Sequence, residues 1–267
     1  MRDELTAAEL KTLWSFKKQD DADRTSAQGR QKAAGCRQSS DPGGTLIITN
    51  YKGDSAEITV PDRIGKNIVT AIAESALSPA GPRKSNPEVL RKITKVTLPD
   101  TIKFIGKEAF WGCENLTEIN IPDGVEEISE SAFFRCKSLK SITIPNSVKI
   151  IGTSAFTGCE NLKQINLPNG ITEIASNTFS SCRSLETVKI PDYVTKIDKF
   201  AFKFCDNLKS VIIPPSVTII ENDTDSSGKT WTVFHSSANV TAIVEPNSYA
   251  DQYCKRNEIK YKYSEVK

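Results

Sequence analysis

The sequence predicts a solenoid, in which coils of 23 residues stack on one another along one axis. Three observations support this fold class. Prolines recur every 23 residues, the apolar residues between them keep the same spacing, and one unit holds too few apolar residues to enclose a core alone. The recurring prolines are Pro99, Pro122, Pro145, Pro168, Pro191 and Pro214.

Each unit carries the same apolar residues in the same order. In the unit that begins at Pro122, Val125 and Ile128 are followed by Ala-Phe133, Cys136 and Leu139, and the unit closes with I-x-I before the next proline. The alternation in I-x-I is typical of a short strand with two side chains inward and one outward. Proline ends the strand because it has no N–H to donate. Stacked coils should therefore pair these strands in a parallel sheet.

The regular units have irregular neighbours, which set the expected domain organisation. We expect about seven coils within residues 61–246, with insertions across SPAGPRKSNPE and NDTDSSGKT that form loops. Residues 45–60 should supply N-terminal cap strands, and residues 247–267 a C-terminal cap. Residues 1–44 should hold a short helix, a strand and a flexible polar loop.

The caps have recognisable local signals. Thr6 and Glu9 fit a capping box for a helix that ends near Leu13, and Trp14-Ser-Phe16 could pair with the strand at 45–49. The polar stretch 20–44, which includes Cys36, has no apolar period and predicts a loop. Near the C-terminus we expect a helix at 248–257 and a last strand at 259–263.

The unit P-x-x-V-x-x-I-x-x-x-A-F-x-x-C-x-x-L-x-x-I-x-I-P resembles the BspA-like leucine-rich repeat, also called the Treponema pallidum type. The segments GTLIITNYKGDSAEITVPDRI and EPNSYADQYCKRNEIKYK are similar to those that flank such repeats. The resemblance covers residues 45–263. It implies a right-handed α/β leucine-rich-repeat solenoid with a hairpin-like N-terminal cap, and a non-enzymatic role in protein–protein contact. Members of this family are often bacterial surface proteins implicated in adhesion to host matrix proteins or other cells.

Composition limits the partners. The net charge of +2, from 35 basic and 33 acidic residues, gives no reason to expect nucleic acid or an anionic membrane. No apolar run approaches the roughly 20 residues that span a bilayer, so no membrane insertion is expected. We expect a monomer that binds a protein or other macromolecule. The resemblance implies a secreted or surface protein, whereas the start MRDELTAAELKTLW lacks the features of a signal peptide and favours the alternative, a cytoplasmic structural or regulatory module.

The cysteines are expected to be structural. Five of the seven occupy one position of the repeat, from Cys113 to Cys205 at intervals of 23. A column of parallel side chains converges neither on a metal ion nor on the torsion of a disulfide. We therefore expect small buried thiols that bond weakly to backbone carbonyls, and Ser237 takes the same place in the last coil.

No catalytic, metal or cofactor site is predicted. The single histidine, His235, has no nucleophile motif beside it and should face outward. Asp223 and Asp225 resemble the start of a calcium loop, but Phe234 stands where the chelating glutamate belongs, so a polar loop is the simpler interpretation.

Two outward surfaces are candidates for binding a partner. The first consists of the outward residues of the I-x-I strands, which are short and polar and vary from coil to coil. They are Lys95, Thr97, Glu118, Asn120, Ser141, Thr143, Gln164, Asn166, Thr187, Lys189, Ser210 and Ile212. The second is an aromatic patch at the turn after Ala-Phe, formed by Trp111, Phe134 and Phe204. The alternative for these rings is that they only shield the seams between coils.

Overall fold

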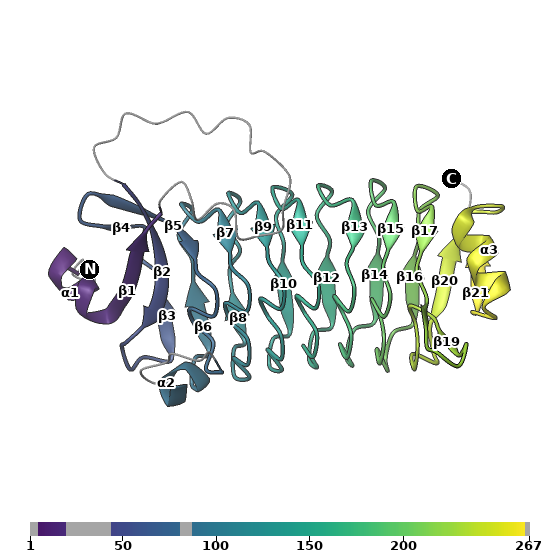
Figure 1. Cartoon of the computed structure of the whole chain (residues 1–267), viewed down its shortest axis with the longest axis horizontal. Coiled ribbons are helices and arrows are strands. Elements are labelled where there is room, and N and C mark those ends of the chain that lie inside the picture. The colour runs from purple at the N-terminus through teal and green to yellow at the C-terminus, as the bar shows by residue number, and fades with distance from the viewer. Residues whose placement is uncertain (1–4, 20–43, 81–86, 265–267) are drawn as a thin grey trace.

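A computed structural model of the chain describes residues 5–19, 44–80 and 87–264. They form an elongated β-solenoid with the N-terminal cap at one end and the C-terminal cap at the other (Figure 1). The predicted solenoid of 23-residue coils is confirmed. About nine coils stack, and the helices are few and short. The expected loop at 20–44, with Cys36, lies outside the described residues.

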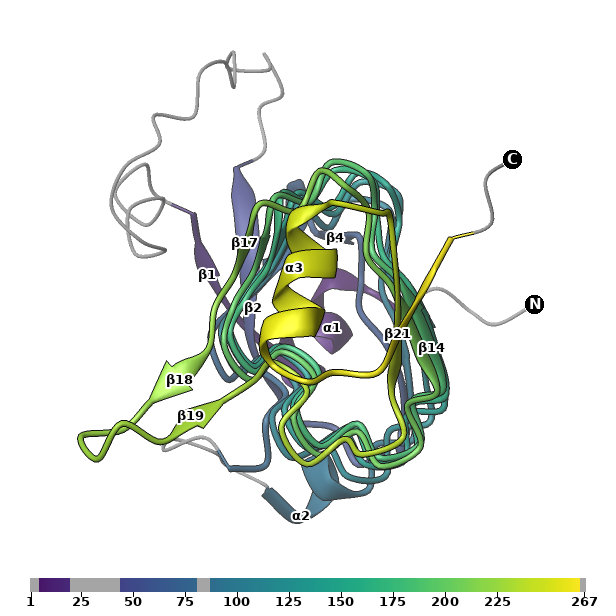
Figure 2. The ribbon, with the colours of Figure 1, turned by 90° about the vertical axis from the view of Figure 1, so that its right-hand side faces the viewer.

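Two ladders of parallel strands run along opposite sides of the solenoid, as the view along its axis shows (Figure 2). Ladder A contains the predicted I-x-I strands, and equivalent residues of successive coils face each other, as Ile142 faces Ile165. Its strands are β3 (Glu57–Thr59), β6 (Lys95–Thr97), β8 (Glu118–Ile119), β10 (Ser141–Thr143), β12 (Gln164–Asn166), β14 (Thr187–Lys189), β16 (Ser210–Ile212), β20 (Thr241–Val244) and β21 (Tyr261–Tyr263).

Of ladder B, only the pairing of Trp14-Ser-Phe16 with the strand near 45–49 was expected from the sequence, and it is confirmed as β1 with β2. From β7 onward the ladder consists of two-residue strands that end at the second aliphatic residue after each proline, which is too short a run to show an alternating pattern. Its strands are β1 (Trp14–Lys18), β2 (Thr45–Tyr51), β4 (Arg63–Ile64), β5 (Asn67–Ile72), β7 (Phe104–Ile105), β9 (Glu127–Ile128), β11 (Ile150–Ile151), β13 (Glu173–Ile174), β15 (Lys196–Ile197) and β17 (Ile219–Ile220).

The two insertions flank the Ala-Phe turns of their coils and lie at the same edge of the cross-section (Figure 2). The first contains helix α2 (Pro87–Arg91), and the second forms a hairpin from β18 (Asp223–Thr224) and β19 (Thr230–Trp231). The second insertion is thus a hairpin rather than the expected loop. The carboxylate of Asp225 closes its turn by accepting hydrogen bonds from the backbone N–H groups of Ser227 and Lys229, at 2.9 and 3.1 Å.

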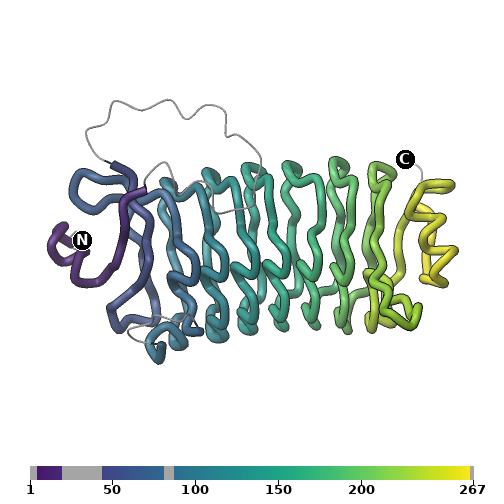
Figure 3. The backbone as a smooth tube through the Cα atoms, in the orientation of Figure 1, coloured from purple at the N-terminus to yellow at the C-terminus, as the bar shows by residue number. Residues whose placement is uncertain are grey.

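The core consists of columns of identical residues. The rings of Phe110, Phe133, Phe156, Phe179, Phe202 and Phe234 stack with centroids 5.1–5.8 Å apart and planes within 21° of parallel. These spacings exceed the strand spacing of about 4.8 Å, so neighbouring rings are offset, which is a favourable arrangement for aromatic pairs. The tube in Figure 3 shows how closely the backbone repeats from coil to coil.

The turn around Ala-Phe needs left-handed backbone at two positions in each coil. The first position holds Glu108, Ser131, Ser154, Asn177 and Phe200, with φ between 55° and 59°. The second precedes the cysteine or Ser237 and holds Gly112, Arg135, Gly158, Ser181, Phe204 and Ser236, with φ between 56° and 78°. Glycine and small polar residues adopt this region at low cost, whereas bulky residues rarely do.

Both ends of the solenoid are covered as expected. At the N-terminal end, α1 (Ala7–Leu13) begins with the predicted capping box between Thr6 and Glu9, and β1 pairs antiparallel with β2. At the other end, α3 (Tyr249–Arg256) buries Ala250, Tyr253 and Cys254, and β21 completes ladder A. These elements remove the last core residues from water.

Removing one ring from the phenylalanine column should destabilise the protein. We expect Phe156→Ala to lower the free energy of unfolding by about 3–5 kcal/mol, because a fully buried ring and both of its stacking neighbours lose contact. Phe156→Leu should cost less, since Leu77 occupies the equivalent place in an earlier coil and is fully buried. Urea unfolding followed by circular dichroism measures both losses. Equal stability of Phe156→Ala and wild type would contradict the proposed role of the column.

The C-terminal cap should weaken in acid. The carboxylate of Asp251 accepts hydrogen bonds from the Lys255 ammonium and the Asn247 backbone N–H, both at 2.9 Å, and these contacts lower the pKa of Asp251. A group with a lowered folded-state pKa stabilises the fold above its unfolded pKa of about 4, and this contribution is lost as the pH falls below that value.

We therefore expect Asp251→Asn to be less stable than wild type at pH 7, with the difference shrinking between pH 5 and pH 3. Urea midpoints measured across this range for both proteins test the expectation. A difference that stays constant with pH would show that the Asp251 charge does not contribute.

Candidate functional site

The outward residues of ladder A lie along one side of the solenoid, and the strand pairing places them in rows. Thr143 is level with Asn166, and Lys189 is level with Ile212. The side chains of Thr97, Thr143, Asn166 and Lys189 are exposed, while the next residue along each strand points into the core. The structure thus brings the twelve predicted residues onto one surface, which we call face A.

The N-terminal part of face A is engaged within the protein. The Lys95 ammonium lies 2.7 Å from the carboxylate of Glu118, and this contact raises the pKa of Lys95. The side-chain amide of Asn120 accepts a hydrogen bond from the Leu98 backbone N–H at 2.7 Å and donates one to its carbonyl at 2.8 Å. These two bonds extend the link between the coils of β6 and β8 beyond the point where their strand pairing ends. Asn120 therefore has a structural role.

The middle of face A is available to a partner. The side chains of Thr143, Gln164, Asn166 and Lys189 form no hydrogen bond or ion pair with the part of the chain that the structure describes. Their backbone is held by the ladder, so they project from a rigid support. Such an arrangement limits the entropy that a partner must overcome on binding.

The structure divides the predicted aromatic patch. The rings of Trp111 and Phe134 meet edge to face with centroids 5.7 Å apart, so they cover the seam between two coils. Phe204 is three coils further along and packs against His235, with centroids 6.2 Å apart. The three residues do not form one surface because Phe204 belongs to a distant coil and to the left-handed position that Gly112 and Arg135 hold in theirs.

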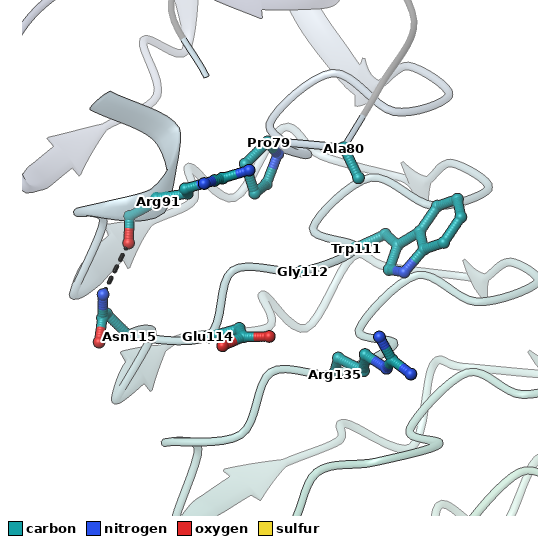
Figure 4. Close-up of a pocket in the computed structure, with 8 residues that line it drawn as sticks. All are labelled: Pro79, Ala80, Arg91, Trp111, Gly112, Glu114, Asn115 and Arg135. Atoms are coloured by element: carbon teal, nitrogen blue, oxygen red, sulfur yellow. Dashed lines mark hydrogen bonds between the residues drawn. The ribbon is translucent and has the colours of Figure 1, made fainter. Parts of the chain in front are cut away.

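A cavity of about 420 Å³ adjoins Trp111 (Figure 4). Its wall also includes Arg135, and on the side of α2 the side-chain amide of Asn115 donates a hydrogen bond to the carbonyl of Arg91 at 2.8 Å. The sequence pattern identified Trp111 here but missed Arg91 and Arg135. Arg135 stands where neighbouring coils have glycine or serine, and this departure was an available signal, whereas Arg91 holds a position that is charged in the following coils as far as Asp206 and gave none.

The cysteine column is structural, as predicted. Each thiol of the column is fully buried and donates a hydrogen bond to a carbonyl of the preceding coil. The acceptor is Leu77 for Cys113 and the column phenylalanine for the other four, as for Cys159 to Phe133 at 3.2 Å. The hydroxyl of Ser237 makes the same bond to the carbonyl of Phe202 at 2.7 Å. Burial raises the pKa of Cys159 and Cys205 to about 12, so these thiols stay protonated at neutral pH.

The other polar candidates are also accounted for. His235 is half-buried between the rings of Phe204 and Trp231. Asp225 closes the hairpin turn, and Asp223 lies 3.2 Å from the Lys199 ammonium. Within residues 5–19, 44–80 and 87–264, no group of three or more histidine, cysteine or acidic side chains is placed to hold a metal ion.

Comparison with known proteins agrees with this architecture. The model of the BspA type leucine-rich repeat region matches residues 89–182 and 127–258, which together span more than half of the chain. The chain belongs to the BspA-type leucine-rich repeat family. No curated protein matches it at a significant level.

Solved structures of leucine-rich repeat proteins resemble this one. A leucine-rich repeat protein from T. pallidum is 26% identical with a TM-score of 0.50, and the match covers 82% of this chain and 90% of that one. A leucine-rich repeat protein from Bacteroides ovatus is 22% identical with a TM-score of 0.43, covering 78% of this chain and 68% of that one.

None of the helices described here has the length and apolar character needed to cross a membrane.

The structural role of the cysteines predicts their reactivity. In a Cys36→Ser variant, the six remaining thiols are all buried, so we expect no reaction with an aromatic disulfide reagent at pH 8 in the native state. Six thiols should react after unfolding in guanidinium. Counting the released thiolate by absorbance tests this, and a thiol that reacts rapidly in the native protein would contradict a purely structural column.

Proposed function

We propose that this protein is a non-enzymatic protein-binding module that uses the middle of face A to hold its partner. The observation that supports the proposal is the row of unpaired side chains Thr143, Gln164, Asn166 and Lys189 on a rigid parallel ladder. Family membership points the same way, because leucine-rich repeats are generally interaction modules. No arrangement of side chains described above assembles a nucleophile with a base.

The resemblance to adhesion proteins supports a more specific form of the proposal. In this form the protein is displayed on, or secreted from, a bacterial cell and holds a host matrix or cell-surface protein. Face A extends along the length of the solenoid (Figure 1), which suits a partner that makes contacts over several coils. Fractionation of cells that make the native full-length product tests the location, and a strictly cytoplasmic product would favour a regulatory or structural module instead.

The binding surface itself can be tested with bulky substitutions that leave the core intact. We expect Thr143→Arg combined with Asn166→Arg to reduce retention of protein partners from host-cell extracts at least about tenfold, because two large charged side chains then interrupt the centre of the surface. Quantitative mass spectrometry of material retained on the immobilised protein gives the measurement.

The matched control places the same two substitutions on the opposite side of the coils. Thr172→Arg with Thr218→Arg changes exposed threonines beside ladder B and should leave retention unchanged. If both double variants retain partners as well as wild type does, face A is not the binding surface.

A further inference from the structure

An aromatic and cationic cluster lies where the β18–β19 hairpin meets the Ala-Phe edge of the solenoid. We call it the hairpin cluster. It contains Phe200, Lys203 and Phe204 from one turn, His235 from the next coil, and Lys229 and Trp231 from the hairpin. The hairpin projects from the body of the solenoid at this edge (Figure 2). None of these residues belongs to face A.

Two phenylalanines of the cluster have an unfavourable backbone conformation. Phe200 has φ 59° and Phe204 has φ 56°, and the equivalent residues of the four preceding coils are glycine, serine, asparagine, glutamate or arginine. A bulky residue in the left-handed region is a true outlier. Phe204 is also 39% exposed, although its ring contacts His235 edge to face. Strain of this kind, with so little burial to offset it, points to a function.

The positive charges of the cluster have no acidic partner. The Lys203 ammonium lies 4.5 Å from the ring centroid of Phe200 and 4.9 Å from that of Phe204, and the Lys229 ammonium lies 5.6 Å from that of Trp231. Neither lysine forms an ion pair with any residue in the described ranges. By contrast, Arg183, Lys199 and Lys209 in the same coils each pair with a carboxylate.

The ammonium groups of Lys203 and Lys229 both influence His235. Burial and the positive charges of Lys203 and Lys229 lower the pKa of His235, whose ring lies between Phe204 and Trp231. His235 is therefore neutral at pH 7. Lys203 lies over Phe204 and Lys229 over Trp231, the two rings that His235 contacts, so the ammonium groups of two different segments gather around one small cluster.

We propose that the hairpin cluster binds an acidic segment of a protein partner, in which carboxylates meet Lys203 and Lys229 and a neighbouring apolar side chain packs on Phe204. Charge complementarity supports an anion, and the exposed ring supports an adjacent apolar group. An acidic polysaccharide is the alternative ligand, and the saccharide probe in the test distinguishes it from the peptide. The inference shares with the proposed function only the premise that the partner is a protein.

The test uses the full chain and a fluorescein-labelled peptide of eight residues in which aspartate alternates with leucine. We expect measurable binding by fluorescence anisotropy at low salt and weaker binding as salt screens the charges. The same peptide with asparagine in place of aspartate should bind at least about tenfold more weakly. An oligogalacturonate of equal charge serves as the saccharide probe, and it should bind more weakly than the acidic peptide.

Two variants separate the contributions of charge and ring. We expect Lys203→Gln with Lys229→Gln to weaken peptide binding about tenfold or more. Phe204→Ser, which restores the residue found at Ser181 and Ser236, should weaken binding while leaving the protein at least as stable in urea. Loss of binding in Phe204→Ser is therefore not explained by unfolding.

The control is Lys140→Gln with Lys149→Gln, which removes the same charge from exposed lysines outside the cluster. It should change the affinity less than twofold. The inference is overturned if the peptide does not bind, if this control weakens binding as much as the cluster variant, or if the saccharide binds as well as the peptide. The Thr143→Arg and Asn166→Arg variant should still bind the peptide, so failure of face A and failure of the cluster are distinguishable.

Discussion

The hydrogen bond from each cysteine of the column to a carbonyl in the Ala-Phe or Ala-Leu turn of the preceding coil requires successive coils to stand in register. The thiol can reach that carbonyl only if the Ala-Phe turns lie directly above one another, and the same alignment stacks the rings. The backbone makes the same demand, because Phe133 donates its N–H to the carbonyl of Ala155 one coil further on. An insertion within the turn would break all three sets of contacts together. Insertions are accordingly found beside the turn, in α2 and in the β18–β19 hairpin.

Register also explains why the molecule has extended surfaces rather than a pocket with converging polar groups. Side chains at equivalent positions are parallel and separated by about 5 Å, so they form rows and do not point at a common atom. Rows suit contact with another macromolecule over a long distance. Most of the ion pairs among the described residues join neighbouring coils, as in Lys107 with Glu130 at 3.0 Å. Such exposed pairs contribute little to stability, about 0–1 kcal/mol each.

The two candidate surfaces differ in how the fold builds them. Face A is made by the repeat itself, so its side chains vary freely while the backbone remains constant. The hairpin cluster is made by departures from the repeat, namely an insertion and two phenylalanines where the turn favours small residues. A protein that binds its partner through both surfaces would combine a broad contact by uncharged and charged polar side chains on face A with a local contact by lysines and aromatic rings at the hairpin cluster.

The sequence by itself determined the solenoid, the cysteine and phenylalanine columns, the caps and the residues of face A. It could do so because contacts between residues 23 positions apart repeat, and each copy reinforces the same pattern. Tertiary structure decided the features that do not repeat from coil to coil, namely which face A side chains are already bonded and which residues the hairpin brings together. Asn120 looks like its neighbours on face A, but its amide forms two hydrogen bonds with the backbone of Leu98 in the preceding coil. Trp231 and Lys229 come beside Lys203 and His235 only because the hairpin folds back on the edge, and the geometry of a single insertion has no periodic copy that would reveal it.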